Sequence, residues 1–410
     1  MKKIRLGEVA DVRISGVDKK TAPGELPIRL CNYTDVYYNW TIRPTMHDGF
    51  MVASAKEDEI TKFRLLAGQV VMTKDSETRD DIGHTAFVSS DFEDVILGYH
   101  CALISPQNGV LDGCYLNALF RTRHIADYLA RNAGGSGQRY YLSESAIRDV
   151  PLCLPPYDAQ LRIAGVLGSI DEKIELNRKK IAELEALAKT IYDYWFVQFD
   201  FPDKNGKPYK SSGGKMVWNE QLKREIPVGW ETCTIGQLCY CHDSKRIPLS
   251  GKQRIEMKGD IPYYGATGVM DYVDKYIFDG EYLLFAEDGS VMTENGFPIL
   301  QIICGKTWVN NHAHVLSPRI KCSVKFLQLH FRNIPVRKIK TGSIQPKVTK
   351  ENLFSFKVLS IPTTILCEVD SILDSIQERI EITEQTFVSL THQRDTLLPL
   401  LMNGQVEVAG

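Results

Sequence analysis

The chain has 410 residues, of which 43% are hydrophobic and 24% are charged, and its formal net charge is −2 at pH 7. These values are ordinary for a soluble globular protein of two to four domains, and the charge argues against a generic binder of polyanions. No apolar run reaches eighteen residues, and the start Met1, Lys2, Lys3 does not open a signal peptide. We therefore expect no membrane span and a cytoplasmic protein.

Residues 1–157 have the pattern of a globular domain of mixed strands and loops. Short buried strands are predicted at 69–72, 85–88 and 101–104, because apolar runs there are bounded by Gly, Asp and Ser. Helical spacing extends from residue 116 to residue 130.

A long helix is predicted over residues 158–199. Its apolar positions recur at alternating steps of four and three residues for more than four heptads, and charges of both signs occupy the outward positions. This is the pattern of a coiled-coil seam, formed by Ile163, Leu167, Ile170, Ile174, Asn177, Ile181, Leu184, Ala188, Ile191 and Trp195. A buried Asn in such a seam usually fixes the register of a partner helix, so Asn177 predicts a partner.

The second half of the chain has the same organisation. Residues 200–229 are rich in Pro, Gly and Ser and have the composition of a linker. Residues 230–362 are predicted to form a second domain, with strands at 282–285, 299–303 and 314–316 and a helix at 324–333.

A second long helix is predicted over residues 363–404, followed by a tail at 405–410. Its seam is the first seam moved forward by 206 residues: Val369, Leu373, Ile376, Ile380, Thr383, Phe387, Leu390, Arg394, Leu397 and Leu401. Arg394 replaces Ala188 near the far end, where fraying is expected. In the alternative arrangement, each helix packs only on its own domain. Two matching helices in one chain favour pairing with each other.

The chain is therefore a tandem repeat. Leu6 aligns with Ile235, His100 with His312, and Gly135 with Gly342, and only loop deletions separate the two halves. The predicted fold class is α+β, with two globular mixed α/β domains in tandem and two long helices.

The sequence contains no complete catalytic motif and no complete set of metal ligands at the usual spacing. Gly214 and Lys215 are followed by Met216 and lack the earlier glycine of a phosphate-binding loop. Pro155-Pro156-Tyr157 matches part of an amino-methyltransferase signature, but Leu154 stands where the amino-binding residue is needed, so a helix start is the better interpretation. His312 and His314 lack a third ligand nearby, and the ten scattered cysteines are interpreted as reduced thiols, so we predict no metal site.

One block of the second half is strongly basic. Between Glu294 and Glu351 there is no acidic residue, and such a block favours phosphate contacts and attracts a nucleic acid. Its cations are Lys306, Arg319, Lys321, Lys325, Arg332, Arg337, Lys338, Lys340, Lys347 and Lys350. The first domain has 18 basic and 20 acidic residues, so there the inference rests on the repeat.

A glycine loop recurs at the same place in both halves, at 135–140 and 342–347. Free backbone amides, a hydroxyl, a side-chain amide and a cation suit contacts to phosphates and base edges, although a plain turn is the alternative. The candidate nucleic-acid contacts are Lys74, Arg79, His100, Ser136, Gln138, Arg139, Tyr140, Tyr264, Thr267, Asn310, Asn311, His312, Lys338, Lys340, Ser343, Gln345 and Lys347.

Several motifs together resemble one family. They are Pro155-Pro156 with 160–164, the run 195–197 through Phe201-Pro202, the segment 206–214, the segment 226–230, and the closing run 393–404. Across its whole length the chain resembles the specificity subunit of a type I restriction-modification enzyme. One departure is Ile361-Pro362, which stands where the first helix has Pro155-Pro156.

The resemblance implies two target-recognition domains, each reading one half of a bipartite site in double-stranded DNA. It implies that the helices form an antiparallel pair that holds the domains apart and docks two methyltransferase subunits. It also implies that restriction subunits with endonuclease and translocase activity join the complex. Methylation and cleavage would then belong to those partners, which would bind S-adenosylmethionine, ATP and Mg²⁺, so no cofactor is expected in this chain.

Two other classes of function remain open. A fused methyltransferase-nuclease would carry catalytic domains in this chain, and methyl transfer by the purified chain alone would identify it. A coiled-coil adaptor that binds only protein would leave the mobility of DNA unchanged even with a methyltransferase partner.

Overall fold

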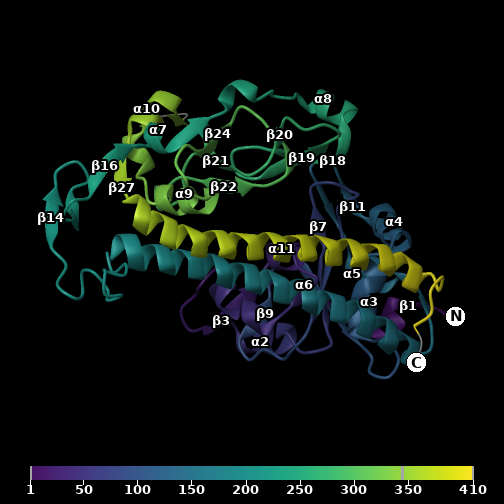
Figure 1. The fold of residues 1–410 in the computed structure, drawn as a ribbon. Coiled ribbons are helices and arrows are strands. Elements are labelled where there is room, and N and C mark those ends of the chain that lie inside the picture. The colour runs from purple at the N-terminus through teal and green to yellow at the C-terminus, as the bar shows by residue number, and fades with distance from the viewer. Residues whose placement is uncertain (1, 343–345, 409–410) are drawn as a thin grey trace. The chain divides into compact units, whose positions relative to one another are not determined.

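The computed structural model describes residues 2–342 and 346–408. The chain divides into two compact units (Figure 1). The first unit comprises Met1–Lys179 and Gln385–Gly410, and the second comprises Lys180–Glu384. Each unit therefore contains one globular domain and one part of each long helix, which confirms the expected fold class.

The first domain is built on a five-stranded sheet, with smaller sheets beside it. The five strands, in spatial order, are β2 (Ala10–Ile14), β10 (Cys101–Pro106), β6 (Val70–Thr73), β8 (Thr85–Val88) and β4 (Thr41–Ile42). The smaller sheets are β1 (Lys2–Arg5) with β13 (Pro151–Leu154); β5 (Met51–Ala55), β3 (Leu26–Cys31) and β9 (Val95–Leu97); and β11 (Gly134–Ser136), β12 (Arg139–Tyr141) and β7 (Asp75–Ser76). The helices of this domain are α1 (Tyr33–Tyr37), α2 (Glu57–Phe63), α3 (Gly113–Phe120), α4 (Arg123–Asn132) and α5 (Glu144–Arg148).

The second domain repeats this plan with four strands in its central sheet. In spatial order they are β17 (Cys239–Cys241), β24 (Ala313–Pro318), β21 (Tyr282–Ala286) and β22 (Leu300–Ile303). The other sheets are β16 (Glu231–Thr234) with β27 (Lys357–Ser360); β19 (Val269–Val273), β18 (Lys258–Tyr264), β23 (Lys306–Val309) and β20 (Phe278–Asp279); and β25 (Lys340–Thr341) with β26 (Lys347–Val348). The helices are α7 (Ile235–Leu238), α8 (Gly251–Glu256), α9 (Val324–Phe331) and α10 (Lys350–Ser355).

The two domains share the order of their central strands. In the first domain β10 pairs antiparallel with β2 and β6, and in the second β24 pairs antiparallel with β17 and β21. The predicted central strands all fall on these sheets, because short apolar runs buried on both faces are typical of central strands. The tandem repeat inferred from the sequence is thus a repeat of topology.

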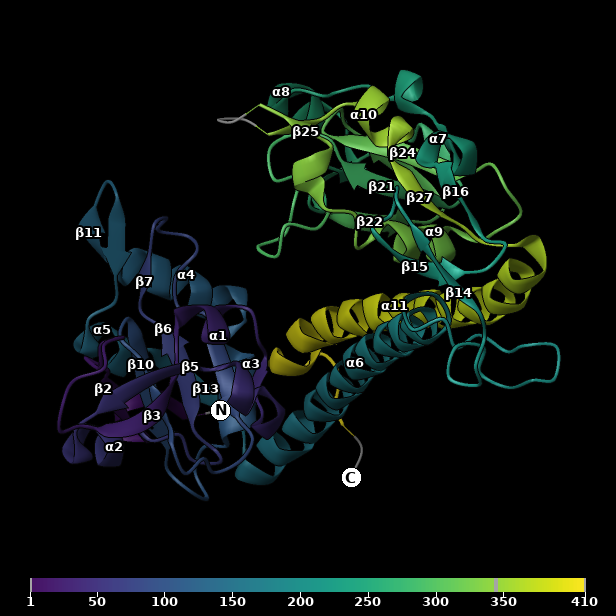
Figure 2. The same cartoon turned by 90° about the vertical axis from the view of Figure 1, so that its left-hand side faces the viewer.

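Two long helices contribute to both units. Helix α6 extends over Tyr157–Tyr192 and continues as a π-helical turn over Asp193–Val197, and α11 extends over Thr363–Met402. In the first unit, Leu167 of α6 shares a hydrophobic cluster with Leu398 and Leu401 of α11. In the second unit, Ala188 shares a cluster with Leu373. The helices therefore pair antiparallel within each unit, and they lie side by side in Figures 1 and 2.

Both predicted seams face inward. Every seam residue of α6 and α11 is buried or half-buried, including Ile163, Ile170, Ile174, Ile181, Leu184, Ile191, Ile376, Ile380, Phe387, Leu390 and Leu397. The partner helix expected from Asn177 is present as α11, whereas the contact described for Asn177 is local. Its amide donates to the carbonyl of Lys173 at 2.8 Å within the same helix, so it needs no partner across the seam. Thr383 behaves in the same way, because its hydroxyl donates to the carbonyl of Arg379 at 2.6 Å.

Arg394 is also placed differently from our expectation of a frayed end. Its guanidinium lies 4.5 Å from the centre of the Trp40 ring and 3.9 Å from the carboxylate of Asp171. Arg121 contacts the same ring at 4.6 Å. Because cations are attracted to the face of an indole, this contact anchors the C-terminal part of α11 on the first domain.

The helix predicted from residue 116 to residue 130 is two helices, α3 and α4, with a break at Arg121 and Thr122. Thr122 is extended, and Arg121 donates to the carbonyl of Thr85 at 2.6 Å. The break lets Arg121 reach the neighbouring sheet, which helical periodicity does not reveal.

The segment expected to be a linker contains a hairpin, β14 (Met216–Asn219) and β15 (Arg224–Pro227). Phe201 stacks on Trp230 with ring centres 5.0 Å apart, and Phe199 and Ile226 are buried in the same cluster. Aromatic packing thus orders a segment whose composition is that of a linker. None of the described helices is long and apolar enough to cross a membrane.

Candidate nucleic-acid interface

The first candidate site forms where β6 leaves the sheet of the first domain and β10 enters it. Asp75 is buried there and forms an ion pair with His100. Lys74 Nζ lies 3.0 Å from the same carboxylate, and the carbonyl of His100 accepts a hydrogen bond from the Lys74 amide at 2.9 Å. Three of the predicted residues, Lys74, His100 and Arg139, therefore gather around one buried carboxylate that was not predicted from the sequence.

His100 joins this carboxylate to the glycine loop. Arg139 Nη2 lies 2.7 Å from His100 Nδ1 and 3.0 Å from His100 Nε2, and Nδ1 also faces Asp75. Arg139 Nη2 also lies 3.8 Å from the Asp75 carboxylate, so the three side chains form one cluster. The backbone of His100 is left-handed, with φ of 71°, a conformation that is uncommon for a residue with a side chain and that marks a constrained position.

The predicted glycine loop is the hairpin of β11 and β12, which projects from the first domain (Figure 2). Gly135 has φ of 99°, and a Cβ there would lie 2.2 Å from the carbonyl oxygen of Arg139, so glycine is required. Strand β12 pairs with β7, which places Tyr140 opposite Ser76. The loop residues Ser136, Gln138 and Arg139 are exposed. Their donors and acceptors are therefore available to a ligand.

A pocket of about 500 Å³ lies beside this hairpin. Its walls include His100, Gln138 and Arg139 and the tyrosines of α1, Tyr33 and Tyr37. Tyr38, which is 74% exposed, lines it as well. These tyrosines were not predicted from the sequence, because they lie far from the loop in the chain. The spacing of Tyr33 and Tyr37 along one short helix, with Tyr38 directly after it, is the signal that would have selected them.

The remaining candidates of the first domain border the same region. The guanidinium of Arg79 lies 5.2 Å from the centre of the Tyr140 ring, and Arg79 is exposed. This cation–π contact holds Arg79 next to the hairpin. Every candidate selected in the first domain thus lies on or beside the hairpin.

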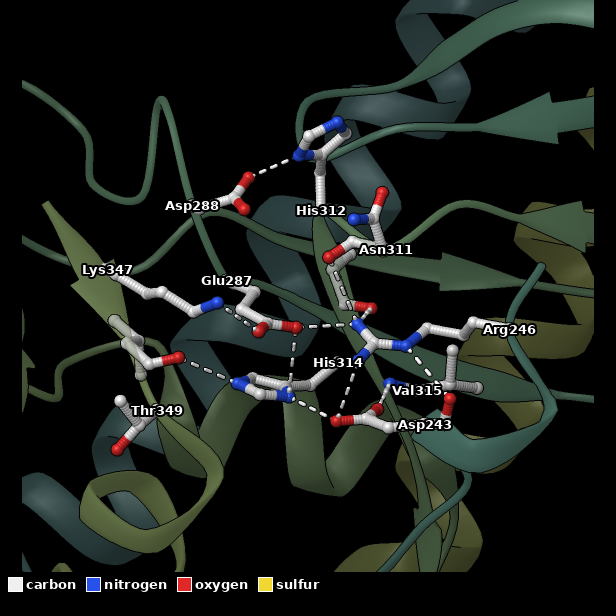
Figure 3. Close-up of polar contacts among 12 residues, drawn as sticks. Asp243, Arg246, Glu287, Asp288, Asn311, His312, His314, Val315, Lys347 and Thr349 are labelled. Atoms are coloured by element: carbon white, nitrogen blue, oxygen red, sulfur yellow. Dashed lines mark hydrogen bonds and ion pairs between the residues drawn. The ribbon is translucent and has the colours of Figure 1, made fainter. Parts of the chain in front are cut away.

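The second domain has an equivalent arrangement on β21, β24 and β26. His312 forms an ion pair with Asp288, and Lys347 Nζ lies 3.1 Å from Glu287 (Figure 3). Asn311 and His312 are exposed, whereas Asn310 is buried and its side chain accepts from the His312 amide at 2.8 Å. Candidate cations therefore meet carboxylates at the end of β21, as they do at the end of β6 in the first domain.

A buried charge network supports this site (Figure 3). His314 Nδ1 lies 2.6 Å from Asp243, and its Nε2 lies 2.9 Å from the carbonyl of Val348 on β26. Arg246 lies 2.6 Å from Glu287 and 3.2 Å from Asp243. Burial lowers the pKa of His314, but the hydrogen bond and the charge of Asp243 outweigh it and raise the pKa to about 10. The charged imidazole therefore holds β26 against β24.

Asp243, Arg246 and Glu287 were not selected from the sequence. Apart from the contact between Arg246 and Asp243, their partners lie more than forty residues away, so no local pattern reveals them. His312 and His314 bind different carboxylates, and neither pairs with the other as a metal ligand among the described contacts.

Other candidates of the second domain are dispersed. Tyr264 is half-buried at the end of β18, and Thr267 is exposed in the turn that follows. Lys340 lies on β25 and pairs with Val348, but Lys338 lines a separate pocket with Tyr192 and Phe196 of the first long helix. Ser343 and Gln345 lie outside the described residues.

The basic block does not form one surface. Lys325 is fully buried with its Nζ 2.6 Å from Glu185 of α6, and Arg332 forms an ion pair with Asp193. These two cations attach the second domain to α6 and are not available to a nucleic acid. Our interpretation of the block as a continuous phosphate-binding stretch is wrong for them, because absence of acids in the sequence does not place all cations on one face.

Comparison with known proteins gives consistent matches. A family model described as the type I restriction modification DNA specificity domain matches residues 1–186 and 227–391. A putative type I restriction enzyme specificity subunit, S.HindORF215P of Haemophilus influenzae, is 34% identical over 157 residues, which are 38% of this chain and 39% of that protein. This match thus spans less than half of that relative.

Longer matches connect the chain to other relatives. The type I restriction enzyme MjaIX specificity subunit of Methanocaldococcus jannaschii is 25% identical over 329 residues, which are 74% of this chain and 71% of that protein. The crystal structure of a type I restriction-modification S subunit from M. genitalium has the same fold, with a TM-score of 0.57 and 15% identity, over 98% of this chain and 95% of that chain.

Proposed function

The chain belongs to the family of type I restriction-modification specificity subunits, and from this premise we propose that each of its two domains reads one half of a bipartite site in double-stranded DNA. The observation that carries the proposal is the duplicated site. In the first domain His100 and Arg139 both contact Asp75 at the end of the preceding strand. In the second domain His312 contacts Asp288 and Lys347 contacts the adjacent Glu287, again at the end of the preceding strand.

The exposed side chains of the hairpin have the chemistry needed to recognise the edges of DNA bases. A guanidinium such as that of Arg139 pairs with the two acceptors of guanine, and an amide such as that of Gln138 pairs with adenine. In the second domain the exposed side chains of Asn311 and His312 offer equivalent groups. Lys74 and Lys347 lie close behind and suit contacts to phosphate.

The buried carboxylates fix these groups without repelling DNA. Lys74 and Arg139 compensate the charge of Asp75, and Arg246 and Lys347 compensate that of Glu287. The cations are held in place before DNA arrives, which lowers the entropy that binding costs.

The role of the helices follows from their pairing. We infer that α6 and α11 set the spacing between the half-sites and dock two methyltransferase subunits, to which restriction subunits with endonuclease and translocase activity are added. A specificity subunit is generally non-catalytic, so S-adenosylmethionine, ATP and Mg²⁺ are assigned to those partners. The complex would act in the cytoplasm, where it would modify the cell's own DNA and defend it against foreign DNA.

Methylation mapping tests the proposal. The chain is combined with its methyltransferase partner, and methylated bases are located in DNA of known sequence. We expect one bipartite motif. Exchange of residues 230–360 for the same region of a relative is expected to change one half-site and leave the other intact, whereas a change in both would refute independent reading.

The same assay separates the other classes of function. Methyl transfer by the purified chain alone would identify a fused methyltransferase, and DNA of unchanged mobility in the presence of the complex would identify a protein adaptor.

A further inference from the structure

A cluster of three metal-binding groups joins the second domain to α11. Glu281 lies in the turn before β21, Cys304 in the turn between β22 and β23, and Glu381 on α11. One oxygen or sulfur atom of each lies within 4.8 Å of the others. We propose that Glu281, Cys304 and Glu381 form a binding site for a zinc-class divalent cation that links the second domain to the helix.

Cys304 and Gln377 both contact the same oxygen of Glu381. Cys304 Sγ lies 3.2 Å from Glu381 Oε1, and the amide nitrogen of Gln377, one turn earlier on α11, donates to the same oxygen at 3.1 Å. The cluster thus combines a thiol, two carboxylates and an amide from three separate elements.

Two buried acceptors in this cluster lack donors. Glu281 Oε1 and Gln377 Oε1 are both buried and have no hydrogen-bond partner among the described residues. Gln377 is only 6% exposed, so water does not easily satisfy its oxygen. Unsatisfied buried acceptors are costly, and a cation with its bound water would satisfy both.

The charge of the surroundings also favours a cation. Asp370 and Asp374 on α11 add negative potential at Glu281. Lys325 is the nearby counter-charge, but its ammonium is already bound to Glu185. An added divalent cation would relieve the repulsion between Glu281 and Glu381.

The donor atoms select the class of metal. Calcium and magnesium prefer shells of oxygen alone, whereas zinc accepts a thiolate together with carboxylates. On binding, the Cys304 thiol would lose its proton to solvent and coordinate as a thiolate, with a water in the fourth position. Cys304 is exposed, which gives the ion a path into the site.

The sequence does not reveal this site. The intervals between Glu281, Cys304 and Glu381 are much longer than those of structural zinc motifs, and only the packing of α11 on the second domain brings them together. The other comparable group among the described residues, Cys241, Asp243 and His314, already holds Arg246 as a counter-charge.

Cobalt binding to the full-length reduced chain tests the proposal. After removal of metals with a chelator, Co²⁺ is added, and near-ultraviolet absorption from cobalt–thiolate charge transfer is recorded. We expect this absorption in the natural chain and its loss in Cys304→Ser. Glu381→Gln removes one ligand and is expected to weaken the binding of Co²⁺ and Zn²⁺ at least about tenfold, which corresponds to about 1.4 kcal/mol of binding free energy.

Two variants that lack a different thiol serve as controls. Cys367→Ser, which removes an exposed thiol of the same helix, is expected to keep the absorption, and so is Cys241→Ser. Zinc is also expected to raise the unfolding temperature of the natural chain and of Cys367→Ser but not of Cys304→Ser, with circular dichroism showing that all variants are folded. No charge-transfer band in the natural chain, an unchanged band in Cys304→Ser, or its loss in Cys241→Ser would overturn the proposal.

Discussion

The guanidinium of Arg394 lies 4.5 Å from the centre of the Trp40 ring, and this contact attaches the end of the second long helix to the first domain. Trp40 is buried, and Arg121 approaches the same ring. A desolvated cation–π pair of this kind contributes about 1–2 kcal/mol.

Replacement of Arg394 by Ala is therefore expected to lower the free energy of unfolding by about 1–2 kcal/mol. A double-mutant cycle with Trp40→Leu measures the coupling by urea denaturation. Additive effects of the two single changes would show that the stacking carries no energy of its own.

The pair of Lys325 and Glu185 gives two opposite expectations. Lys325 is fully buried, so Glu185→Ala leaves a buried ammonium without its partner and is expected to cost about 2–3 kcal/mol, less than for a fully buried pair because Glu185 is partly exposed. Lys325→Met removes the charge and keeps the volume, so it is expected to be neutral or stabilising. Equal losses in both variants, measured by chemical denaturation, would contradict this account.

Stability is expected to depend on pH through His314. Its pKa is raised from 6.5 to about 10 in the folded chain by Asp243 and the Val348 carbonyl, although burial opposes the rise. The folded state therefore keeps a proton that the unfolded state releases, so this stabilisation is complete below about pH 6.5 and is lost as the pH rises to about 10. Urea denaturation across this range is expected to show a falling stability in the natural chain and a flatter profile in His314→Gln. A natural chain that gains stability across the range would contradict the assignment.

Arg139 is expected to determine one half-site. Arg139→Ala should weaken specific DNA binding by about 1–3 kcal/mol and relax one position of the half-site read by the first domain. Arg123→Ala is the matched control, because Arg123 belongs to the same domain, is 95% exposed and lies outside the hairpin. Methylation mapping distinguishes the two, and a change in the half-site of the second domain would count against the assignment.

The helix pair is expected to measure the gap between the half-sites. Four residues inserted after Lys180 and four after Thr386 add about 6 Å to each helix and keep the apolar face nearly in phase. At about 3.4 Å per base pair, the non-specific gap should lengthen by one or two base pairs while both half-sites persist. An unchanged gap in the methylation map would show that the helices do not set the spacing.

The periodic elements of this fold were predictable from the sequence. The strand at 85–88 and the start of α11 at Thr363 agree with the structure, because burial imposes a period that is visible in one sequence. The repeat added independent support, since each element was indicated twice.

Individual side-chain contacts were not predictable from the sequence. Periodicity gave no sign that Asn177 would bond within its own helix, or that Arg121 would end a helix. The same limit applies to the candidate sites. The glycine hairpin was found from local composition, but Asp75 and Asp243 were missed because their partners are distant in sequence.

The division of the chain has a consequence for synthesis on the ribosome. The first unit needs residues Gln385–Gly410, and Leu398, Leu401 and Met402 are buried in the same cluster as Leu6 and Leu116. The first domain therefore waits for α11, which is translated much later, before its core is complete, unlike domains that fold in order of translation. A prematurely terminated product would keep an open apolar surface in the first domain and would be a target for quality-control proteases.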